Sequence, residues 1–166
     1  MILNIGESFV GDGVNAAHVN TLVGGRDGPA GAAWATAIAT PSIGHAAFMA
    51  VVQPGVPCDP PTLFVNKAAI VPGRHAELTW GAAQAGVACG VVDAGEAGAF
   101  NTDRRSGLCV IAAVWVNPEA DDDEVVFNNN REATKEAILA GNNPQNLAAL
   151  ARHAASRPFN AYFRAG

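Results

Sequence analysis

The amino-acid sequence predicts an α+β fold, a two-layer sandwich in which helices pack on one mixed β-sheet. Strand-like and helix-like segments follow one another in the order ββα-ββα-βαα. One strand-like segment, 108–116, is apolar throughout, which suits a central strand covered on both faces. Hydrophobic residues make up 49% of the chain and charged residues 15%, so material for a core is plentiful. We expect a single domain over residues 1–166.

The first half of the chain carries mainly strand patterns. We expect strands at 2–10, 17–23, 48–52 and 63–71, and a helix at 29–39. In the second strand His18 and Asn20 share one face, because side chains alternate along a strand. In the strand at 63–71, Lys67 shares a face with Val65 and Ala69. Four prolines between residues 53 and 61 predict an extended loop without regular structure.

The second half is mainly helical in pattern. We expect a helix at 74–97, the central strand at 108–116, a helix capped by Asn117-Pro118, and a last helix from about 144 to 156. Gly81, Gly86 and Gly90 weaken the first of these helices. They also allow another backbone to approach it closely.

Charge and apolar runs exclude several classes of function. The net charge is −5 and the arginines are scattered, so we expect no nucleic-acid partner. The longest apolar run is less than half a membrane span, and residues 1–13 hold no Lys or Arg, so neither a membrane segment nor a secretory signal is expected. The three cysteines are odd in number and form no CxxC pair, which predicts free thiols and a cytoplasmic protein.

Metal and nucleotide motifs are also missing from the sequence. The four histidines form neither an HExxH motif nor a paired spacing, so no metal site is expected. Residues 11–16 fit a GxGxxA pattern, but a strand rather than a helix is predicted to follow, and a tight turn is the better interpretation. The acidic run 121–124 is interpreted as a solvated helix start.

Two residues stand out as candidates for chemistry. His18 is either an ordinary polar residue of a strand or an acid–base catalyst, since histidine titrates near neutral pH. Lys67 interrupts an otherwise apolar strand face, so it either extends to the sheet edge or points into a site. The chain has only one other lysine, Lys135, and its remaining eight basic residues are arginines.

Several segments, in register over most of the chain, resemble the formaldehyde-activating enzyme family. Residues 6–13, GESFVGDG, are similar to the family's GEALVGDG, and 17–20, AHVN, to its AHID. Further matches are 26–30 to RGSPA, 56–60 to LPCKP, 62–67 to TLMFNK, 81–88 to GPAQHGVA and 132–135 to EATK. The resemblance weakens after about Gly141.

The resemblance implies a hydro-lyase, a carbon–oxygen lyase that condenses formaldehyde with tetrahydromethanopterin to methylene-tetrahydromethanopterin and water. The pterin is a co-substrate, and no metal or redox cofactor is expected. Such enzymes form homopentamers with the pterin between neighbouring subunits, and their fold has a left-handed βαβ crossover. By this resemblance His18 is the general acid, and Lys67, Gln84 and Met49 lie at pterin positions, Met49 where the family has Leu.

Two positions depart from the family pattern. The family's Asp is Asn20 here, and its Thr is Ala69, both at positions expected to contact the pterin. Three hypotheses follow: an active lyase of formaldehyde detoxification, a non-catalytic paralogue that binds a pterin or formaldehyde as sensor or carrier, and a related condensation on tetrahydrofolate or another aldehyde. Some family members are fused to a sugar-phosphate aldolase. The sequence ends at Gly166, so that second activity is not expected.

Overall fold

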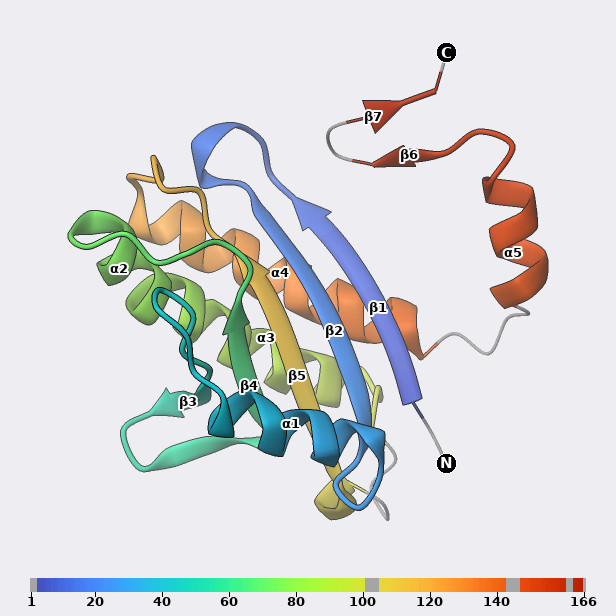
Figure 1. Cartoon of the computed structure of the whole chain (residues 1–166), viewed down its shortest axis with the longest axis horizontal. Helices are drawn as coiled ribbons and strands as arrows, with labels where there is room; N and C mark the ends of the chain where they lie inside the picture. Colours follow the sequence, from blue (N-terminus) through green and yellow to red (C-terminus); the bar gives the residue numbers. More distant parts are fainter. Residues whose placement is uncertain (1–2, 101–104, 143–146, 161–162, 166) are drawn as a thin grey trace.

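A mixed five-stranded sheet forms the centre of the molecule (Figure 1). The computed structural model describes residues 3–100, 105–142, 147–160 and 163–165. The strand order is β1-β2-β5-β4-β3, with β4 and β5 parallel and the other neighbours antiparallel. The strands are β1 (Leu3–Val10), β2 (Ala17–Gly25), β3 (Phe48–Gln53), β4 (Val56–Asn66) and β5 (Leu108–Trp115). The main helices are α1 (Pro29–Ala39), α2 (Arg74–Leu78), α3 (Gln84–Glu96) and α4 (Asp123–Gly141).

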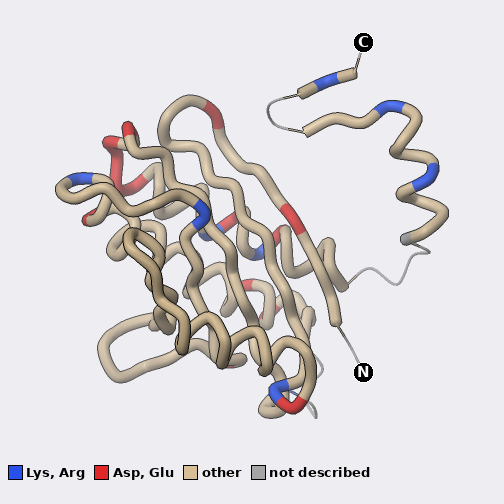
Figure 2. Tube along the Cα trace, viewed as in Figure 1, with Lys and Arg blue, Asp and Glu red and all other residues tan. Residues whose placement is uncertain are grey.

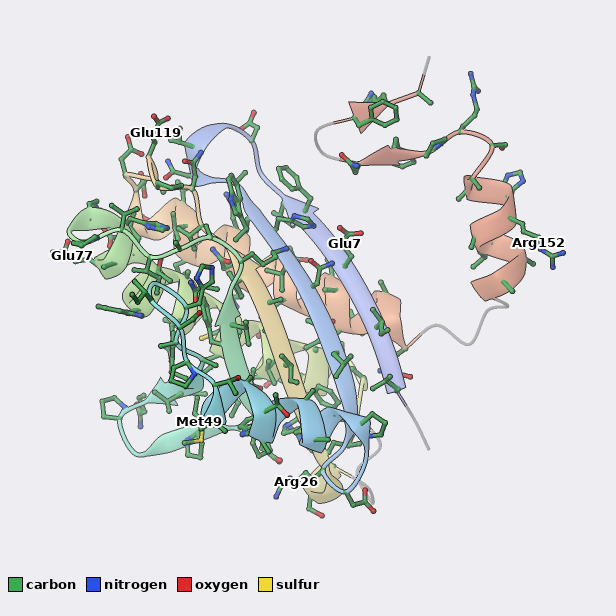
Figure 3. All side chains as sticks on the ribbon, viewed as in Figure 1. Glu7, Arg26, Met49, Glu77, Glu119 and Arg152 are labelled. Carbon is green, nitrogen blue, oxygen red and sulfur yellow. The ribbon has the colours of Figure 1, made fainter. Side chains whose placement is uncertain are left out.

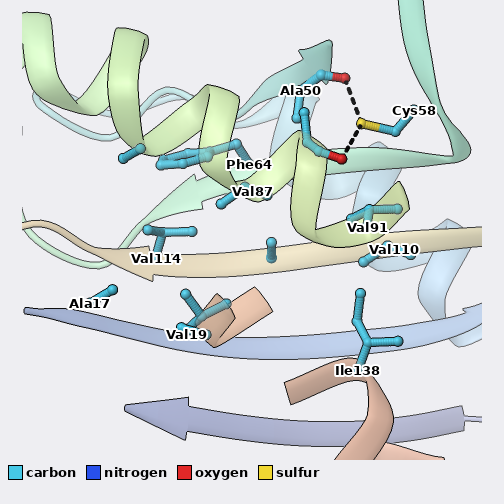
Figure 4. Close-up of a cluster of buried hydrophobic side chains, with 14 of the residues drawn as sticks. Ala17, Val19, Ala50, Cys58, Phe64, Val87, Val91, Val110, Val114 and Ile138 are labelled. Carbon is cyan, nitrogen blue, oxygen red and sulfur yellow. Dashed lines mark hydrogen bonds between the residues drawn. The ribbon is translucent and has the colours of Figure 1, made fainter. Parts of the chain in front are cut away.

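The sheet and two long helices form the two layers that the sequence predicts. Helices α3 and α4 pack side by side on one face of the sheet, whereas α1 lies across the end of the other face (Figure 1). The core lies between the sheet and α3 and α4, and Figure 4 shows part of it. Members labelled there include Val19, Phe64, Val87, Val91, Val110, Val114 and Ile138. Side chains alternate between the two faces along β2 and β5, so every second one points toward the helices and contributes to this core.

The connection from β4 to β5 has the hand that the family resemblance implies. Both strands run upward in Figure 1, α3 returns behind the sheet, and the chain arrives at β5 to the right of β4. A path of this kind is a left-handed crossover, whereas nearly all βαβ connections are right-handed.

Helices α3 and α4 approach so closely that glycine is required at their contact. A Cβ atom at Gly86 would lie 2.4 Å from the carbonyl oxygen of Phe127. One at Gly90 would lie 2.4 Å from the carbonyl oxygen of Arg131. These glycines therefore serve backbone approach, as predicted from the sequence.

The helix predicted at 74–97 is present but contains a wider turn. After α2, residues Thr79–Ala83 form a π turn before α3 begins at Gln84. Gly81 lies in this turn, where a weak helix former is least costly.

The prediction of an irregular loop at 53–61 is wrong, because β4 begins at Val56 and runs through the prolines. Pairing of β4 with β5 begins only at Thr62, so the prolines before it need no amide hydrogen for that ladder. The ladder to β3 carries register shifts in the same stretch. The strand also ends at Asn66 rather than at residue 71. There the Asn66 side-chain amide donates hydrogen bonds to the carbonyl groups of Gly44 and Ala68 and turns the chain.

The last part of the chain differs from its prediction in two ways. Asp122, not Asn117, caps α4, because its carboxylate accepts a hydrogen bond from the amide of Val125 at 3.0 Å. The predicted start of the final helix near residue 144 lies outside the described residues. Helix α5 (Leu147–Ala154) is followed by a short hairpin, β6 (Phe159–Asn160) and β7 (Phe163–Arg164), which the sequence patterns do not indicate. Both lie beyond β1, away from the two layers (Figure 1).

Charged residues are spread over the described surface. Figure 2 shows the basic residues in that part of the chain as separate positions rather than as a continuous patch. None of the helices in the described ranges combines the length and apolar character needed to cross a membrane.

The glycine contact between α3 and α4 yields a stability prediction. We expect Gly90→Ala to lower the free energy of unfolding by about 1–3 kcal/mol, because the new methyl group must push α4 away. Urea denaturation of wild type and variant measures this. Gly81→Ala is the matched control, because its Cβ would meet nothing within 4 Å. Equal destabilisation by both changes would contradict the assignment.

Candidate active site

The outward face of β2 carries polar side chains in the middle of the sheet. The four residues of β2 that face the helices are buried: Ala17, Val19, Thr21 and Val23. His18 and Asn20 point to the opposite face and are half-buried. Helix α1 covers only one end of that face, so these two side chains remain accessible.

His18 is held by a carboxylate from the neighbouring strand. Its Nε2 lies 2.6 Å from Oε1 of Glu7 on β1, and 24% of its side chain is exposed against 61% of Glu7's. An ionised carboxylate can only accept a hydrogen bond, so Nε2 is the ring nitrogen that carries the hydrogen in this contact. Phe9 and Trp115 are the cross-strand neighbours of His18, and the Phe9 ring centroid is 5.9 Å from the imidazole. The ring is thus fixed by one charge and two aromatic neighbours.

Lys67 reaches the same place from the end of β4. Its amide donates to the carbonyl oxygen of Val114 at 2.8 Å, which extends the pairing with β5 by one residue. Its Nζ donates a hydrogen bond to Oδ1 of Asn20 at 2.7 Å. Burial lowers the pKa of Lys67 from 10.5 to about 8, because it removes water from the ammonium group, and the charge of Glu7 opposes this fall.

Four side chains from three strands therefore meet on the open face of the sheet. We call Glu7, His18, Asn20 and Lys67 the polar cluster. Three of its members were predicted from the sequence to be site residues. Glu7 was not, although the hairpin register contains the signal: with the turn at 11–13 as its tip, Glu7 falls opposite Asn20.

Two other predicted site residues, Met49 and Gln84, lie toward the opposite edge of the sheet. Met49 is on β3, the edge strand opposite β1, and 60% of it is exposed; Figure 3 labels it and Glu7 far apart. Gln84, at the start of α3, accepts a hydrogen bond from the amide of Val51 at 2.7 Å and so holds the same edge strand. Ala69 is exposed in the segment that follows Lys67. The structure thus brings His18, Asn20 and Lys67 together and places Met49 and Gln84 separately at the β3 edge.

A cavity opens beside the polar cluster. It has a volume of about 560 Å³, within the range of sites for small molecules. Glu7, Phe9 and His18 line one wall, and Phe159 and Arg164 of the terminal hairpin line the other. Among the described residues, no group of three or more His, Cys, Asp or Glu side chains is arranged to hold a metal ion.

The contact between Lys67 and Asn20 yields a titration prediction. We expect Asn20→Asp to raise the pKa of Lys67 from about 8 toward 10.5, because a carboxylate stabilises the ammonium form and a neutral amide does not. NMR titration of the carbon atom next to Nζ measures it. Asn20→Ala removes the acceptor without adding charge and should leave the pKa low. An unchanged pKa in Asn20→Asp would refute the contact.

Comparison with known proteins places the chain in a family. The family model described as "Formaldehyde-activating enzyme (Fae)" matches residues 5–157. The "Bifunctional enzyme Fae/Hps" of Archaeoglobus fulgidus is 39% identical over 138 residues, which is 83% of this chain and 35% of that protein. The protein of the same name from Methanosarcina barkeri is 34% identical over 137 residues, 82% of this chain and 35% of its own length. The chain thus spans about a third of the length of these relatives. From residue 5 to residue 157, the chain belongs to the formaldehyde-activating enzyme family.

Proposed function

We propose that this protein condenses formaldehyde with tetrahydromethanopterin, giving methylene-tetrahydromethanopterin and water, as a hydro-lyase. The observation that carries the proposal is the polar cluster, in which the imidazole of His18 is hydrogen-bonded to the carboxylate of Glu7 at 2.6 Å beside Lys67. Membership of the family and relatives named as Fae/Hps enzymes support the same chemistry.

The reaction needs an acid at one step. An amine adds to formaldehyde and forms a carbinolamine, and the hydroxyl group of that adduct must leave as water. His18 donates the proton, a role that typically accelerates such a step by about 10²–10⁴-fold. Glu7 holds the imidazole in place through the contact between its Oε1 and Nε2 of His18.

The positions of Met49 and Gln84 support a site shared between subunits. They lie at the β3 edge of the sheet, and the polar cluster lies toward the β1 edge. In a ring of identical subunits, the β3 edge of one protomer can complete the site of the next. We therefore propose a homopentamer with the pterin between neighbours, as the family resemblance implies, and with Ala69 at its rim.

A cytoplasmic location is part of the same proposal. All three cysteines are free thiols: Cys58 and Cys109 are buried and Cys89 is half-buried. Burial raises the pKa of the Cys58 thiol, which keeps it protonated and unreactive. Free thiols of this kind suit a reducing compartment.

The first functional prediction concerns His18. We expect the protein to form methylene-tetrahydromethanopterin faster than the spontaneous reaction, and His18→Ala to lower that acceleration about 10²-fold or more. Stopped-flow absorbance of the pterin, with and without protein, measures the rates. His153→Ala is the control, since His153 lies on the exposed helix α5. Binding of the pterin without acceleration would instead select the non-catalytic sensor or carrier, and a rate equal to wild type in His18→Ala would remove His18 as the acid.

The second functional prediction concerns Glu7. We expect Glu7→Gln to lower kcat about tenfold with a small effect on KM, because an amide can accept the Nε2 hydrogen but cannot balance the imidazolium charge. Steady-state kinetics with varied pterin separate the two constants. Glu119→Gln makes the same chemical change at an exposed position and should leave both unchanged. A change confined to KM would assign Glu7 to substrate binding only.

A further inference from the structure

Lys67 differs from Arg131 and Lys135 in what it contacts. The two nitrogens of Arg131 nearest Asp93 lie 2.6 and 2.9 Å from its carboxylate, and Nζ of Lys135 lies 3.1 and 3.4 Å from the oxygens of Glu132. Nζ of Lys67 instead donates a hydrogen bond to a neutral amide, at Oδ1 of Asn20. A half-buried lysine with this partner lacks the contact that usually holds an amine in its charged form.

The amide oxygen of Asn20 can accept a hydrogen from the neutral amine as well as from the ammonium group. An amine that donates one hydrogen to Asn20 keeps its lone pair free for another bond. With a pKa of about 8, about a tenth of Lys67 is neutral amine at pH 7. The titratable groups around it are Glu7 on β1 and His18 on β2, while β5 contributes Ala113 and Trp115, which do not titrate in this range.

An acid lies close to this amine. His18 and Asn20 are two residues apart on one strand face, so their Cα atoms are separated by about 7 Å. Glu7 links the two halves of the polar cluster, because it is bonded to His18 and its charge acts on Lys67. A small group attached to Nζ therefore lies on the same open face of the sheet as this proton donor, with Asn20 and Glu7 between them.

We propose that Lys67 captures formaldehyde covalently, as a methyleneiminium ion on Nζ, before the carbon passes to the co-substrate. The identity of the final acceptor rests on the proposed function, whereas the capture step itself needs only the amine, the aldehyde and the acid.

The step balances without an oxidant or reductant. The Nζ lone pair forms a bond to the formaldehyde carbon, and the carbonyl oxygen takes up a proton as the nitrogen loses one. His18 then protonates the hydroxyl group, the C–O bond breaks, water leaves, and the nitrogen lone pair forms the C=N bond. One co-substrate amine adds to the iminium carbon, and the second displaces Nζ as a neutral amine. The co-substrate releases two protons: one is carried away on the departing amine, and the other replaces the one consumed.

Reductive trapping without any pterin tests the capture. Dilute formaldehyde and sodium cyanoborohydride convert an iminium ion to an N-methyl group, which adds about 14 Da to the lysine. Because Lys135 is the other lysine of the chain, it provides the internal reference for peptide mass spectrometry. We expect Lys67 to be methylated at least tenfold faster than Lys135, with a rate that rises with pH and levels off above about 8. Equal rates at the two lysines would overturn the proposal.

Two variants sharpen the test. Asn20→Asp should reduce trapping at pH 7 about tenfold or more, because its carboxylate keeps the ammonium form. Lys67→Arg should lose both trapping and most of the condensation rate, whereas Lys135→Arg should keep trapping at Lys67 and the rate. Melting temperatures confirm that the variants fold.

The two proposals fail in different ways. Full condensation activity in folded Lys67→Arg would overturn the capture and leave the proposed function standing. Selective trapping at Lys67 in a protein that does not accelerate the pterin reaction would uphold the capture and reject tetrahydromethanopterin as the acceptor.

Discussion

Strand β2 is hydrogen-bonded on both sides, to β1 and to β5, and its side chains alternate strictly between two faces. This alternation determines which side chains enter the core and which form the polar cluster. Val19 and Val23 pack on the side of α4, while His18 and Asn20 point away from it. A slip of one residue would bury an imidazole and an amide and expose two valines. The core and the polar cluster are therefore two outcomes of one register.

The same register assembles the polar cluster from distant parts of the chain. The hairpin with β1 brings Glu7 to His18, and β5 lies between β2 and β4 as a spacer of small and aromatic residues. The side chain of Lys67 extends across this spacer to Asn20, while its backbone amide donates a hydrogen bond to Val114. The result is one carboxylate facing two groups that can carry positive charge.

The fold class, the helix at 29–39 and the strands β1, β2 and β5 could be predicted from the sequence because periodicity and turn residues are local signals. The course of β4 could not. A proline argues against a strand, because it has no amide hydrogen for the ladder. Here the prolines precede the paired residues, but the partner strand β5 lies more than forty residues further along the chain, so a local pattern cannot show this. The cap of α4 shows a related limit, because Asn117 and Asp122 are both good capping residues and only packing selects between them.

Some residues of the candidate site can also be identified from the sequence, and others cannot. His18, Asn20 and Lys67 could be identified because alternation and family motifs both point to them. Glu7 depends on the pairing of two strands, and the wall formed by the terminal hairpin depends on tertiary placement, which no local pattern records.

The pairing of basic residues has a consequence for the lifetime of the protein. Formaldehyde attacks free amines and cross-links them, so the proposed substrate would itself modify a surface rich in lysine. The guanidinium groups of Arg74 and Arg131 are charged at all working pH values and are held by Asp123 and Asp93, and Lys135 is held by Glu132. Arginine accounts for eight of the ten basic residues. Such a surface offers formaldehyde few lysine amines to modify. The ion pairs that hold these basic groups therefore also limit cross-linking of the protein.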